Sequence, residues 1–308
     1  MTRHVEQHME HSRKAAVVTH DVILHGAIEI GKGSISRYLS SYMIRGASIM
    51  PAYENPDHWD TAAQHYEKTA HPFTSLYAEA ALAKVALTSE SHVLDVAAGT
   101  GALTLAAART GARVLATDFS PGMVARIAAA NLPNVEACVM DGQALTLEDG
   151  LFDAVFSIFG VIMFPDWRKG LSEMARVTRR GGHGVVTTWQ DGGAATFLLL
   201  GQIRRKLFPG RDGMTMPNAV KALSDPSDFA RELIAAGYQD PQIQHVTRDY
   251  ALDVSALAEP DTLFGMSPDW ISLSDTERAA VVAEVRDMAG DRMILPIPST
   301  ALIGVARR

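Results

Sequence analysis

Two glycines that follow a short apolar stretch mark a place where the backbone can approach a ligand. Residues 93–96, Val-Leu-Asp-Val, have the pattern of a buried strand, and Gly99 and Gly101 come just before a helical pattern that begins at Ala102. Because glycine has no Cβ, a ligand there can reach the backbone and the helix N-terminus. A lone glycine turn is weak evidence, but it predicts a ligand site between strand and helix.

An acidic residue at the end of the next predicted strand strengthens this prediction. Asp118 follows the apolar residues 114–117 and stands 19 residues after Gly99. A carboxylate at that place can accept hydrogen bonds from both hydroxyls of a ribose, so we expect its side chain to face ligand or solvent. Its alternative role is to cap the helix that opens at Pro121, although Ser120 is better placed for that.

A dinucleotide cofactor would need the same turn and the same acid, together with a third glycine. That glycine would fall at position 104, which is Thr104, and the sequence has no other glycine-rich turn to hold a pyrophosphate. The residues therefore favour a ligand that contains a ribose and no pyrophosphate.

Composition and charge limit the partners of this site. A net charge of -7 gives no basic footprint for a polyanion, so we expect no nucleic-acid partner. The single cysteine, Cys138, excludes an intramolecular disulfide and a multi-thiolate metal site, and it favours the cytoplasm. Polar residues interrupt the apolar run at 15–30, so we expect no membrane span. We also expect no metal site, since the histidines at 4, 8 and 11 are typical of a solvated terminus.

The glycine turn belongs to a series of alternating strands and helices. Helical stretches at 57–69 and 72–86 precede the series. The predicted strands are 92–96, 113–117, 135–139, 152–159 and 183–189, and the helices between them are 102–110, 121–130 and 166–178. Such alternation predicts a doubly wound α/β fold, in which a mostly parallel sheet is covered on both faces and binds its ligand beyond the carboxyl ends of its strands.

The alternation breaks down after residue 189. Helices are predicted from Asp225, with Pro226 as first residue, and from Ser274, where Glu277 completes a capping-box spacing. The second of these helices would carry Val281, Val285 and Met288 on one face. Two further strands, 242–252 and 299–306, would bring the sheet to seven. We therefore divide the chain into an N-terminal extension (1–56), expected to be helical, a ligand-binding core (57–190), and cap insertions with closing strands of the same domain (191–308).

Five motifs in this order resemble class I S-adenosylmethionine-dependent methyltransferases, particularly the group similar to ubiquinone and menaquinone C-methylases. The resemblance is good over 59–189 and loose from 224 to the end. The motifs are the turn at 97–101, Thr117-Asp118-Phe119-Ser120-Pro121-Gly122-Met123, Asp141-Gly142-Gln143-Ala144, Phe152-Asp153-Ala154-Val155, and Phe159 to Asp166 followed by Glu173-Met174-Ala175-Arg176-Val177 and Gly181-Gly182.

The resemblance implies the Rossmann-like methyltransferase fold, S-adenosylmethionine as cofactor, and a set of residues that bind it. Asp95 would reach the methionine amino group, and the backbone at 97–101 would line the methionine moiety and the ribose. Asp118 would take the ribose hydroxyls. The implied cofactor-binding residues are Tyr66, Asp95, Ala97, Gly99, Gly101, Asp118, Phe119, Met123, Asp141, Gly142, Gln143 and Ser157. Ala97 departs from the family, where many relatives have glycine, and its methyl group is tolerable if φ stays negative.

The remaining implied roles have structural alternatives. Phe119 and Met123 would flank the adenine, and Tyr66 would close over the cofactor, but each could be an ordinary core residue. Asp141 would accept from the adenine amine, or it could be a turn residue before Gly142. The Gly142 and Gln143 backbone would contact the base, and the Ser157 backbone would face the methionine amine.

The sequence shows no general base, which a methyl transfer needs only if the acceptor must lose a proton. Residues 157–160, Ser-Ile-Phe-Gly, differ from the motif of exocyclic-amine enzymes, and Cys138 lies away from a nucleophile's place. We expect metal-free C-, O- or N-methylation of a small metabolite. The alternative is a protein of this fold that binds the cofactor as a scaffold or catalyses a reaction other than methyl transfer. The sequence leaves open whether the protein forms a homodimer. Apolar residues that would suit an apolar or aromatic acceptor, or would merely pack the cap, are Phe197, Leu198, Leu199, Phe208, Met214, Met216, Leu263, Phe264, Met266 and Trp270.

Overall fold

The computed structural model describes residues 42–45, 48–51, 54–190, 195–210, 217–265 and 267–308. The chain divides into two units, Met1–Ala52 and Tyr53–Arg308. In the first unit, β1 (Tyr42–Arg45) and β2 (Ser48–Pro51) pair antiparallel, so the helical expectation for residues 1–56 was wrong for these two segments. The histidines at 4, 8 and 11 lie outside the described residues. Every candidate cofactor residue lies in the second unit.

The described part of the second unit contains a seven-stranded sheet, as the sequence predicted, and its strands lie in the order β5-β4-β3-β6-β7-β9-β8. Strands β3 to β7 run parallel, and β9 runs antiparallel to both of its neighbours. From β3 the chain adds β4 and β5 on one side and β6 and β7 on the other, so the strand order reverses between β3 and β6. A crevice for a ligand forms at such a switch point. The strands are β3 (His92–Val96), β4 (Arg113–Asp118), β5 (Val135–Val139), β6 (Phe152–Ile158), β7 (Thr178–Trp189), β8 (Gln239–Asp253) and β9 (Ile294–Arg307).

Helices cover both faces of this sheet because successive strand residues point to opposite sides. Val93 packs into a cluster with Ala78 and Leu103, whereas Leu94 packs into a cluster with Leu171 and Phe229. The first face carries α3 (Pro56–Leu82), α4 (Ala102–Ala108) and α5 (Pro121–Ala129), and the second carries α6 (Trp167–Val177), α8 (Asn218–Ala222) and α9 (Pro226–Ala235), with the short η2 (Val161–Met163) before α6.

Helix α3 differs from the prediction of two helices separated near Pro72, which was wrong. It runs unbroken from Pro56 to Leu82 with Pro72 inside it. Proline has no N–H to donate within the helix. Next to it, the His71 carbonyl accepts hydrogen bonds from two side chains, the hydroxyls of Thr74 and Ser75, at 3.1 and 2.8 Å. Buried residues beyond the proline, such as Tyr77, hold the helix on course, so tertiary packing overrides the local cost of proline.

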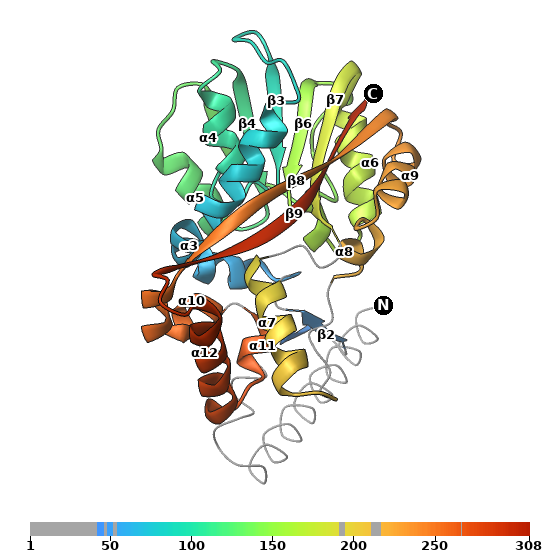
Figure 1. Cartoon of the computed structure of the whole chain (residues 1–308). Coiled ribbons are helices and arrows are strands. Elements are labelled where there is room, and N and C mark those ends of the chain that lie inside the picture. The colour runs from blue at the N-terminus through green and yellow to red at the C-terminus, as the bar shows by residue number, and fades with distance from the viewer. Residues whose placement is uncertain (1–41, 46–47, 52–53, 191–194, 211–216, 266) are drawn as a thin grey trace, which may run out of the picture. The chain divides into compact units, whose positions relative to one another are not determined.

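Strands β8 and β9 extend beyond the sheet as a long two-stranded ribbon that reaches a separate group of helices (Figure 1). These helices share a core of their own, which includes Leu199, Phe264 and Trp270. Of the three residues predicted on one face of the last helix, Val281 and Val285 are buried, whereas Met288 is 38% exposed. The elements of this cap are α7 (Ala195–Leu207), η3 (Val254–Ala258), α10 (Pro260–Phe264), α11 (Pro268–Ile271) and α12 (Asp275–Ala289).

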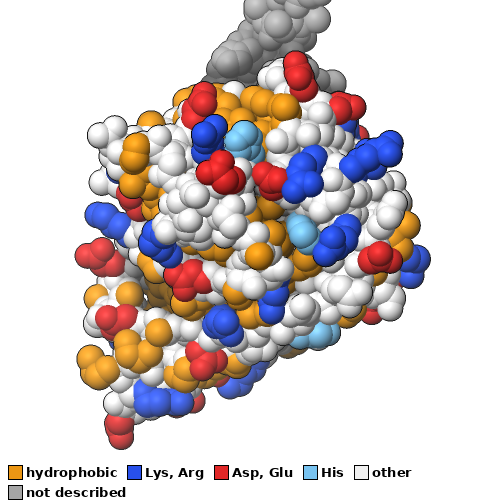
Figure 2. All heavy atoms as spheres, turned by 90° about the horizontal axis from the view of Figure 1, so that it is seen from above, with side chains coloured by type: hydrophobic (Ala, Val, Ile, Leu, Met, Phe, Trp, Pro, Cys, Tyr) orange, Lys and Arg blue, Asp and Glu red, His pale blue; other side chains and the backbone are white. Residues whose placement is uncertain are grey.

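The surface seen from above the sheet carries charges of both signs. In Figure 2, Lys and Arg side chains alternate with Asp and Glu side chains over the part of this face that is drawn in colour. Among the described residues, none of the helices has the length and apolar character that crossing a membrane requires.

Candidate active site

The turn after β3 has the conformation that its glycines predict. Gly99 and Gly101 adopt φ values of +56° and +88°, in the left-handed region that favours glycine. The Ala98 N–H donates to the Thr117 carbonyl on β4 at 2.9 Å, which ties the turn to the neighbouring strand. Gly101 precedes α4 without a side-chain cap, so the start of this helix faces the turn.

Asp95, the acid at the end of β3, is nearly fully buried and reaches the start of α4. Its side chain is 1% exposed, and Oδ2 accepts from both the N–H and the hydroxyl of Thr104, at 3.1 and 2.7 Å. Burial raises the pKa of Asp95 to about 7, although the Thr104 bonds partly offset this, and nearby Asp118 raises it further. A cationic group in the site would favour the ionised form of this carboxyl.

Asp118, at the end of β4, holds the glycine turn from the other side. Its Oδ2 accepts from the Gly99 N–H at 2.9 Å and its Oδ1 from the Ser120 N–H at 3.0 Å. Its side chain is 5% exposed, so it does not face solvent as the sequence suggested, and its contact with a ligand stays a prediction. Burial raises the pKa of Asp118, against the lowering effect of these N–H bonds. The capping alternative is answered in favour of Ser120, which caps α5.

Ala97 does not keep the negative φ that the sequence analysis required of it. Its φ is +54°, a left-handed conformation that costs a non-glycine residue about 1 to 2 kcal/mol. A Cβ added at Gly160 would lie 2.5 Å from the Ala97 Cβ. Ala97 therefore fits only because Gly160, at the end of β6, leaves room for its methyl group.

Helix α3 passes over the glycine turn. The Tyr66 ring lies 3.8 Å from where a Gly99 Cβ would be, and burial raises the pKa of its hydroxyl to about 12. Further along the helix, the His71 Nδ1 lies 2.7 Å from the Thr100 hydroxyl. Tyr66 therefore lies beside the turn, and its role in closing over a ligand stays a prediction.

The start of α5 lies beside the same helix. Phe119 is half-buried and Met123 is nearly fully buried, so both lie where an adenine or ordinary core packing would place them. Asp60 of α3 accepts from the Ser120 hydroxyl at 2.5 Å and from the Gly122 N–H at 2.7 Å. Nothing in the sequence pattern pointed to Asp60, because its partners are 60 or more residues away.

The loop after β5 carries the residues expected at the adenine. Asp141 is exposed and its Oδ1 accepts from the backbone and side-chain N–H groups of Gln143, at 2.9 and 3.1 Å. Gly142 is buried, and a Cβ there would lie 2.5 Å from the Phe164 ring. Asp141 is thus a turn residue in this structure, with its carboxylate open to solvent.

The end of β6 is fixed by Ser157, whose side chain is fully buried. Its hydroxyl donates to the Val96 carbonyl at 2.9 Å and accepts from the Val161 N–H at 3.1 Å, so it joins the ends of β6 and β3. The next residue, Ile158, lines the hollow beside the glycine turn. Ser157 is therefore a structural side chain whose backbone lies at the switch point.

Aromatic rings from α3, β7 and β8 gather where β6 ends. Phe159 adopts a φ of +59°, its N–H donates to the Thr187 hydroxyl at 2.8 Å, and its ring stacks on Trp189 with centroids 4.0 Å apart. Tyr77 meets both rings edge-on. We call Phe73, Tyr77, Phe159, Trp189 and Tyr250 the aromatic cluster.

The residues of the turn enclose a narrow hollow. Its volume is about 20 Å³, which is room for roughly one water molecule. The hollow is therefore only the part of the candidate site that lies between Tyr66 and the turn. The lining residues are Tyr66, Thr74, Asp95, Ala97, Ala98, Gly99, Thr100, Ala102, Leu103 and Ile158.

The structure thus brings together Tyr66, Asp95, Ala97 and Gly99 around one hollow. Asp118 is bonded to the same turn, and 141–143 lie on a separate loop. Sequence reasoning missed Asp60, His71 and the aromatic cluster. Of the residues expected to line an acceptor pocket, Leu199, Phe264 and Trp270 are buried in the cap's own core, whereas the side chains of Phe197 and Leu198, with Met214, Met216 and Met266, lie outside the described residues.

Comparison with known proteins identifies the family of the chain. Residues 93–182 match a family model described as a methyltransferase domain. A demethylmenaquinone methyltransferase of Corynebacterium efficiens is 36% identical over 165 residues, which cover 50% of this chain and 70% of that protein. One from Mycolicibacterium gilvum is 34% identical over 171 residues, covering 52% and 74%.

Solved structures show the same fold. The YcgJ protein of Bacillus subtilis superposes with a TM-score of 0.51 at 18% identity, covering 75% of this chain and 98% of that one. A protein of Bacillus halodurans described as a putative methyltransferase superposes with a TM-score of 0.50, also at 18% identity, covering 75% and 97%.

Proposed function

The chain belongs to the class I S-adenosylmethionine-dependent methyltransferases of the quinone C-methylase type, and on that premise we propose that its methyl acceptor is a small apolar molecule with an aromatic or quinone-like ring. Its cofactor is S-adenosylmethionine. The relatives' name, demethylmenaquinone methyltransferase, supports a ring carbon as the acceptor atom.

The residues of the turn fit this cofactor. The left-handed glycines leave the backbone open, and two buried carboxylates, Asp95 and Asp118, lie on either side of the turn. We propose that Asp118 accepts from the ribose hydroxyls and that Asp95 faces the methionine amino group. When bound, the cofactor supplies a methyl group on a positively charged sulfur. Tyr66 would exclude water from the reacting end.

We propose the other end of the cofactor lies along α5 and the loop after β5. Phe119 and Met123 would flank the adenine, and Asp141 would accept from its exocyclic amine, with the Gly142 and Gln143 backbone at the ring edge. The Ala97, Gly101 and Ser157 backbones would line the methionine moiety. Residues 57–190 would then be the cofactor-binding core, and residues 191–308 the cap and closing strands.

The aromatic cluster is the observation that carries the acceptor proposal. Ile158 lines the cofactor hollow, and the very next residue, Phe159, begins the cluster. A bulky residue with positive φ is strained, and such strain persists at functional sites where surrounding contacts enforce it. Stacked and edge-on rings bind planar apolar ligands well, so the cluster suits a ring presented to the methyl group.

A methylation assay tests the acceptor. Purified protein is given S-adenosylmethionine with a reduced naphthoquinone that lacks the ring methyl group, with the same compound already methylated, and with a phenol, a catechol and an amine. We expect S-adenosylhomocysteine and a ring-methylated product from the first compound alone. Trp189→Leu should raise KM for this acceptor and leave cofactor affinity unchanged. Products methylated only on oxygen or nitrogen would overturn the proposal.

Location and assembly follow as further proposals. The single cysteine supports the cytoplasm, and the negative net charge supports an acceptor other than nucleic acid. A homodimer is the assembly to test first, and light scattering of the purified protein measures it directly.

A further inference from the structure

The loop of residues 140–151 connects β5 to β6 and lies outside the strands of the sheet. Backbone groups in such a connection need partners from elsewhere if they are not left to water. Most of the partners in this loop come from one helix, α6, and two side chains of that helix supply several of them. These two residues, Glu173 and Arg176, have no role in the function proposed above.

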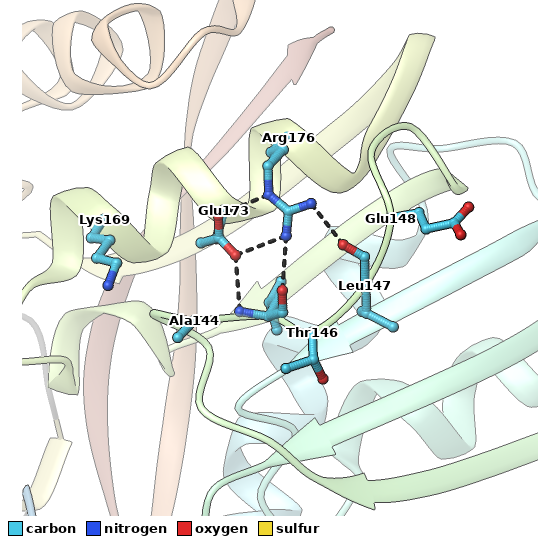
Figure 3. Close-up of a pocket in the computed structure, with 8 residues that line it drawn as sticks. Ala144, Thr146, Leu147, Glu148, Lys169, Glu173 and Arg176 are labelled. Carbon is cyan, nitrogen blue, oxygen red and sulfur yellow. Dashed lines mark hydrogen bonds and ion pairs between the residues drawn. The ribbon is translucent and has the colours of Figure 1, made fainter.

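Glu173 and Arg176 hold the middle of the loop. The Glu173 Oε2 accepts from the Leu145 N–H at 2.9 Å, and the Arg176 guanidinium donates to the Leu145 and Leu147 carbonyls at 2.9 and 2.7 Å. Figure 3 shows both side chains directed from α6 toward this backbone. Leu145 is buried, so its N–H and carbonyl are tied to α6 on the protein side of the loop.

The two side chains also hold each other. Two N–H groups of Arg176 donate to the two Glu173 oxygens, each at 2.8 Å, a bidentate arrangement that is strong and fixed in direction. The Arg176 hydrogen bond lowers the pKa of Glu173. The Arg176 side chain is 29% exposed and the Glu173 side chain is 19% exposed, whereas Asp149, a further partner of Arg176, is 80% exposed. The contact with Asp149 therefore contributes little, and the backbone contacts dominate.

The same helix fixes the start of the loop. The Gln143 side-chain oxygen accepts from the N–H of Asp166, the N-cap of α6, at 2.7 Å, and Gln143 also donates to Asp141. Gly142 packs on Phe164, just before the helix. The position of the Asp141 carboxylate is therefore set by two attachments to α6, one at its N-terminus and one at Glu173 and Arg176.

We propose that Glu173 and Arg176 are positioning residues for adenine recognition, because they hold the loop that presents Asp141 to the base. The proposal rests on the assignment of Asp141 to the adenine amine in the proposed function. The shallow hollow that these residues line, together with Lys169 and residues 144–148, is then a support for the loop.

The test compares two ligands, S-adenosylhomocysteine and the analogue whose base is unsubstituted purine, which lacks the exocyclic amine. Calorimetry gives the ratio of their dissociation constants for wild type, Asp141→Ala, Arg176→Lys and Arg168→Lys. Arg168 is the matched control, because it lies on α6 and pairs with Glu232 without contact to the loop. Lysine keeps the charge of arginine and loses its planar fork.

We expect wild type to prefer S-adenosylhomocysteine by roughly tenfold, which is the worth of one charge-assisted hydrogen bond. Asp141→Ala should bring the ratio near one, and Arg176→Lys should lower it at least about threefold by weakening S-adenosylhomocysteine alone. Arg168→Lys should leave it unchanged. A merely structural role for Arg176 would weaken both ligands equally.

Two contrary results are distinguishable. A wild-type ratio in Asp141→Ala would overturn the adenine assignment and the positioning role with it. A lowered ratio in Asp141→Ala with a wild-type ratio in Arg176→Lys would overturn the positioning role alone. Thermal melts accompany each protein. If Arg176→Lys is unfolded at the assay temperature, the Glu173→Gln variant is measured instead. We expect it to lower the ratio of dissociation constants by a smaller factor, and a wild-type ratio in this variant would count against the proposal.

Discussion

Asp118 has two tasks in this structure, since it holds the turn through the Gly99 and Ser120 N–H groups and is proposed to bind the ribose. Asp118→Ala should therefore lose stability as well as affinity. Each charge-assisted bond to a hydroxyl is worth about 1.5 to 3 kcal/mol before water offsets part of it, so we expect the dissociation constant of S-adenosylhomocysteine to rise roughly tenfold to several-hundredfold. Asp118→Asn should cost less, because one acceptor oxygen remains.

Calorimetry and thermal melts separate these two effects. A 2′-deoxy analogue serves as the control, because it lacks one of the hydroxyls and should discriminate less between mutant and wild type. Wild-type affinity for S-adenosylhomocysteine in Asp118→Ala would remove the ribose assignment.

The raised pKa of Asp95 predicts a pH dependence. Its folded value, about 7, exceeds the ordinary value of 3.8, so the free protein binds more protons than the unfolded chain between these values. This carboxyl therefore makes the free protein less stable as pH rises from about 4 to 7. The ammonium group of the methionine moiety binds the ionised form of Asp95 more tightly. The affinity for S-adenosylhomocysteine should therefore rise about tenfold for each unit that the pH increases up to about 7, and level off above pH 7.

Calorimetry at pH 6 in buffers of different ionisation enthalpy checks this, with release of about one proton per bound ligand expected. Asp118, which also faces Asp95, carries a raised pKa as well, so Asp95→Asn is the variant that isolates the effect. Equal proton release by wild type and Asp95→Asn would contradict the assignment of the proton to Asp95.

Ala97 stores strain that glycine would relieve. Because Ala97 has a φ of +54°, Ala97→Gly should remove about 1 to 2 kcal/mol of backbone strain from the folded state. Glycine also makes the unfolded chain more flexible, and the entropic cost of folding that this adds is somewhat smaller than the strain removed. We expect a net gain of roughly 0.5 to 1 kcal/mol in the free energy of unfolding. Ala98→Gly is the matched control, because Ala98 is in the same turn and is not among the positive-φ residues; it should lose stability. Urea unfolding measures both, and a loss in Ala97→Gly as large as in Ala98→Gly would contradict the strain.

At the scale of elements, we expect α3 to restrain a bound cofactor, because its Tyr66 ring lies beside the glycine turn. Asp60 holds its N-terminal part to the start of α5, and Glu67 pairs with Arg126 on the same helix. Asp60→Ala should speed dissociation of S-adenosylhomocysteine at least about fivefold, which corresponds to the loss of roughly 1 kcal/mol of hydrogen bonding in the closed form.

Stopped-flow fluorescence can follow this step through Trp59, whose ring lies 6.1 Å from the Tyr66 ring. Asp57→Ala is the control, since Asp57 is an exposed acid in the first turn of the same helix. Equal dissociation rates in Asp60→Ala and wild type would show that the contact does not restrain the helix.

Elements and residues differed in how far the sequence could predict them. The strands and the mostly parallel sheet followed from apolar periodicity and alternation, which are local signals. The continuity of α3 across Pro72 was not predicted, because proline is a local signal for a break and the packing of Tyr77 overrides it. The φ of Ala97 and the partners of Asp60 depend on contacts across 60 or more residues, and no spacing in a single sequence reports these.

At the scale of the whole molecule, the proposed functions fall on different parts of the second unit. The cofactor turn and the adenine loop lie on the half of the sheet formed by β3 to β6, whereas β8 and β9 carry the chain to the cap helices (Figure 1). Phe73 packs against both the core on the sheet and the core of the cap, and the Tyr250 ring, which packs on the cap core, meets Phe73 edge-on. The aromatic cluster is thus the place where cap and cofactor core meet.

The last prediction concerns the first unit, Met1–Ala52. All seven strands of the large described sheet lie between His92 and Arg307, and every proposed cofactor residue lies between Tyr66 and Ser157. A chain that begins at Tyr53 should therefore fold and bind S-adenosylhomocysteine within about twofold of the full chain, a difference under 0.5 kcal/mol. Calorimetry and thermal melts of both chains measure this, and Asp118→Ala in each should lose affinity by the same factor. Retained folding with lost binding would place part of the cofactor site in residues 1–52, and loss of folding would show that these residues complete the core.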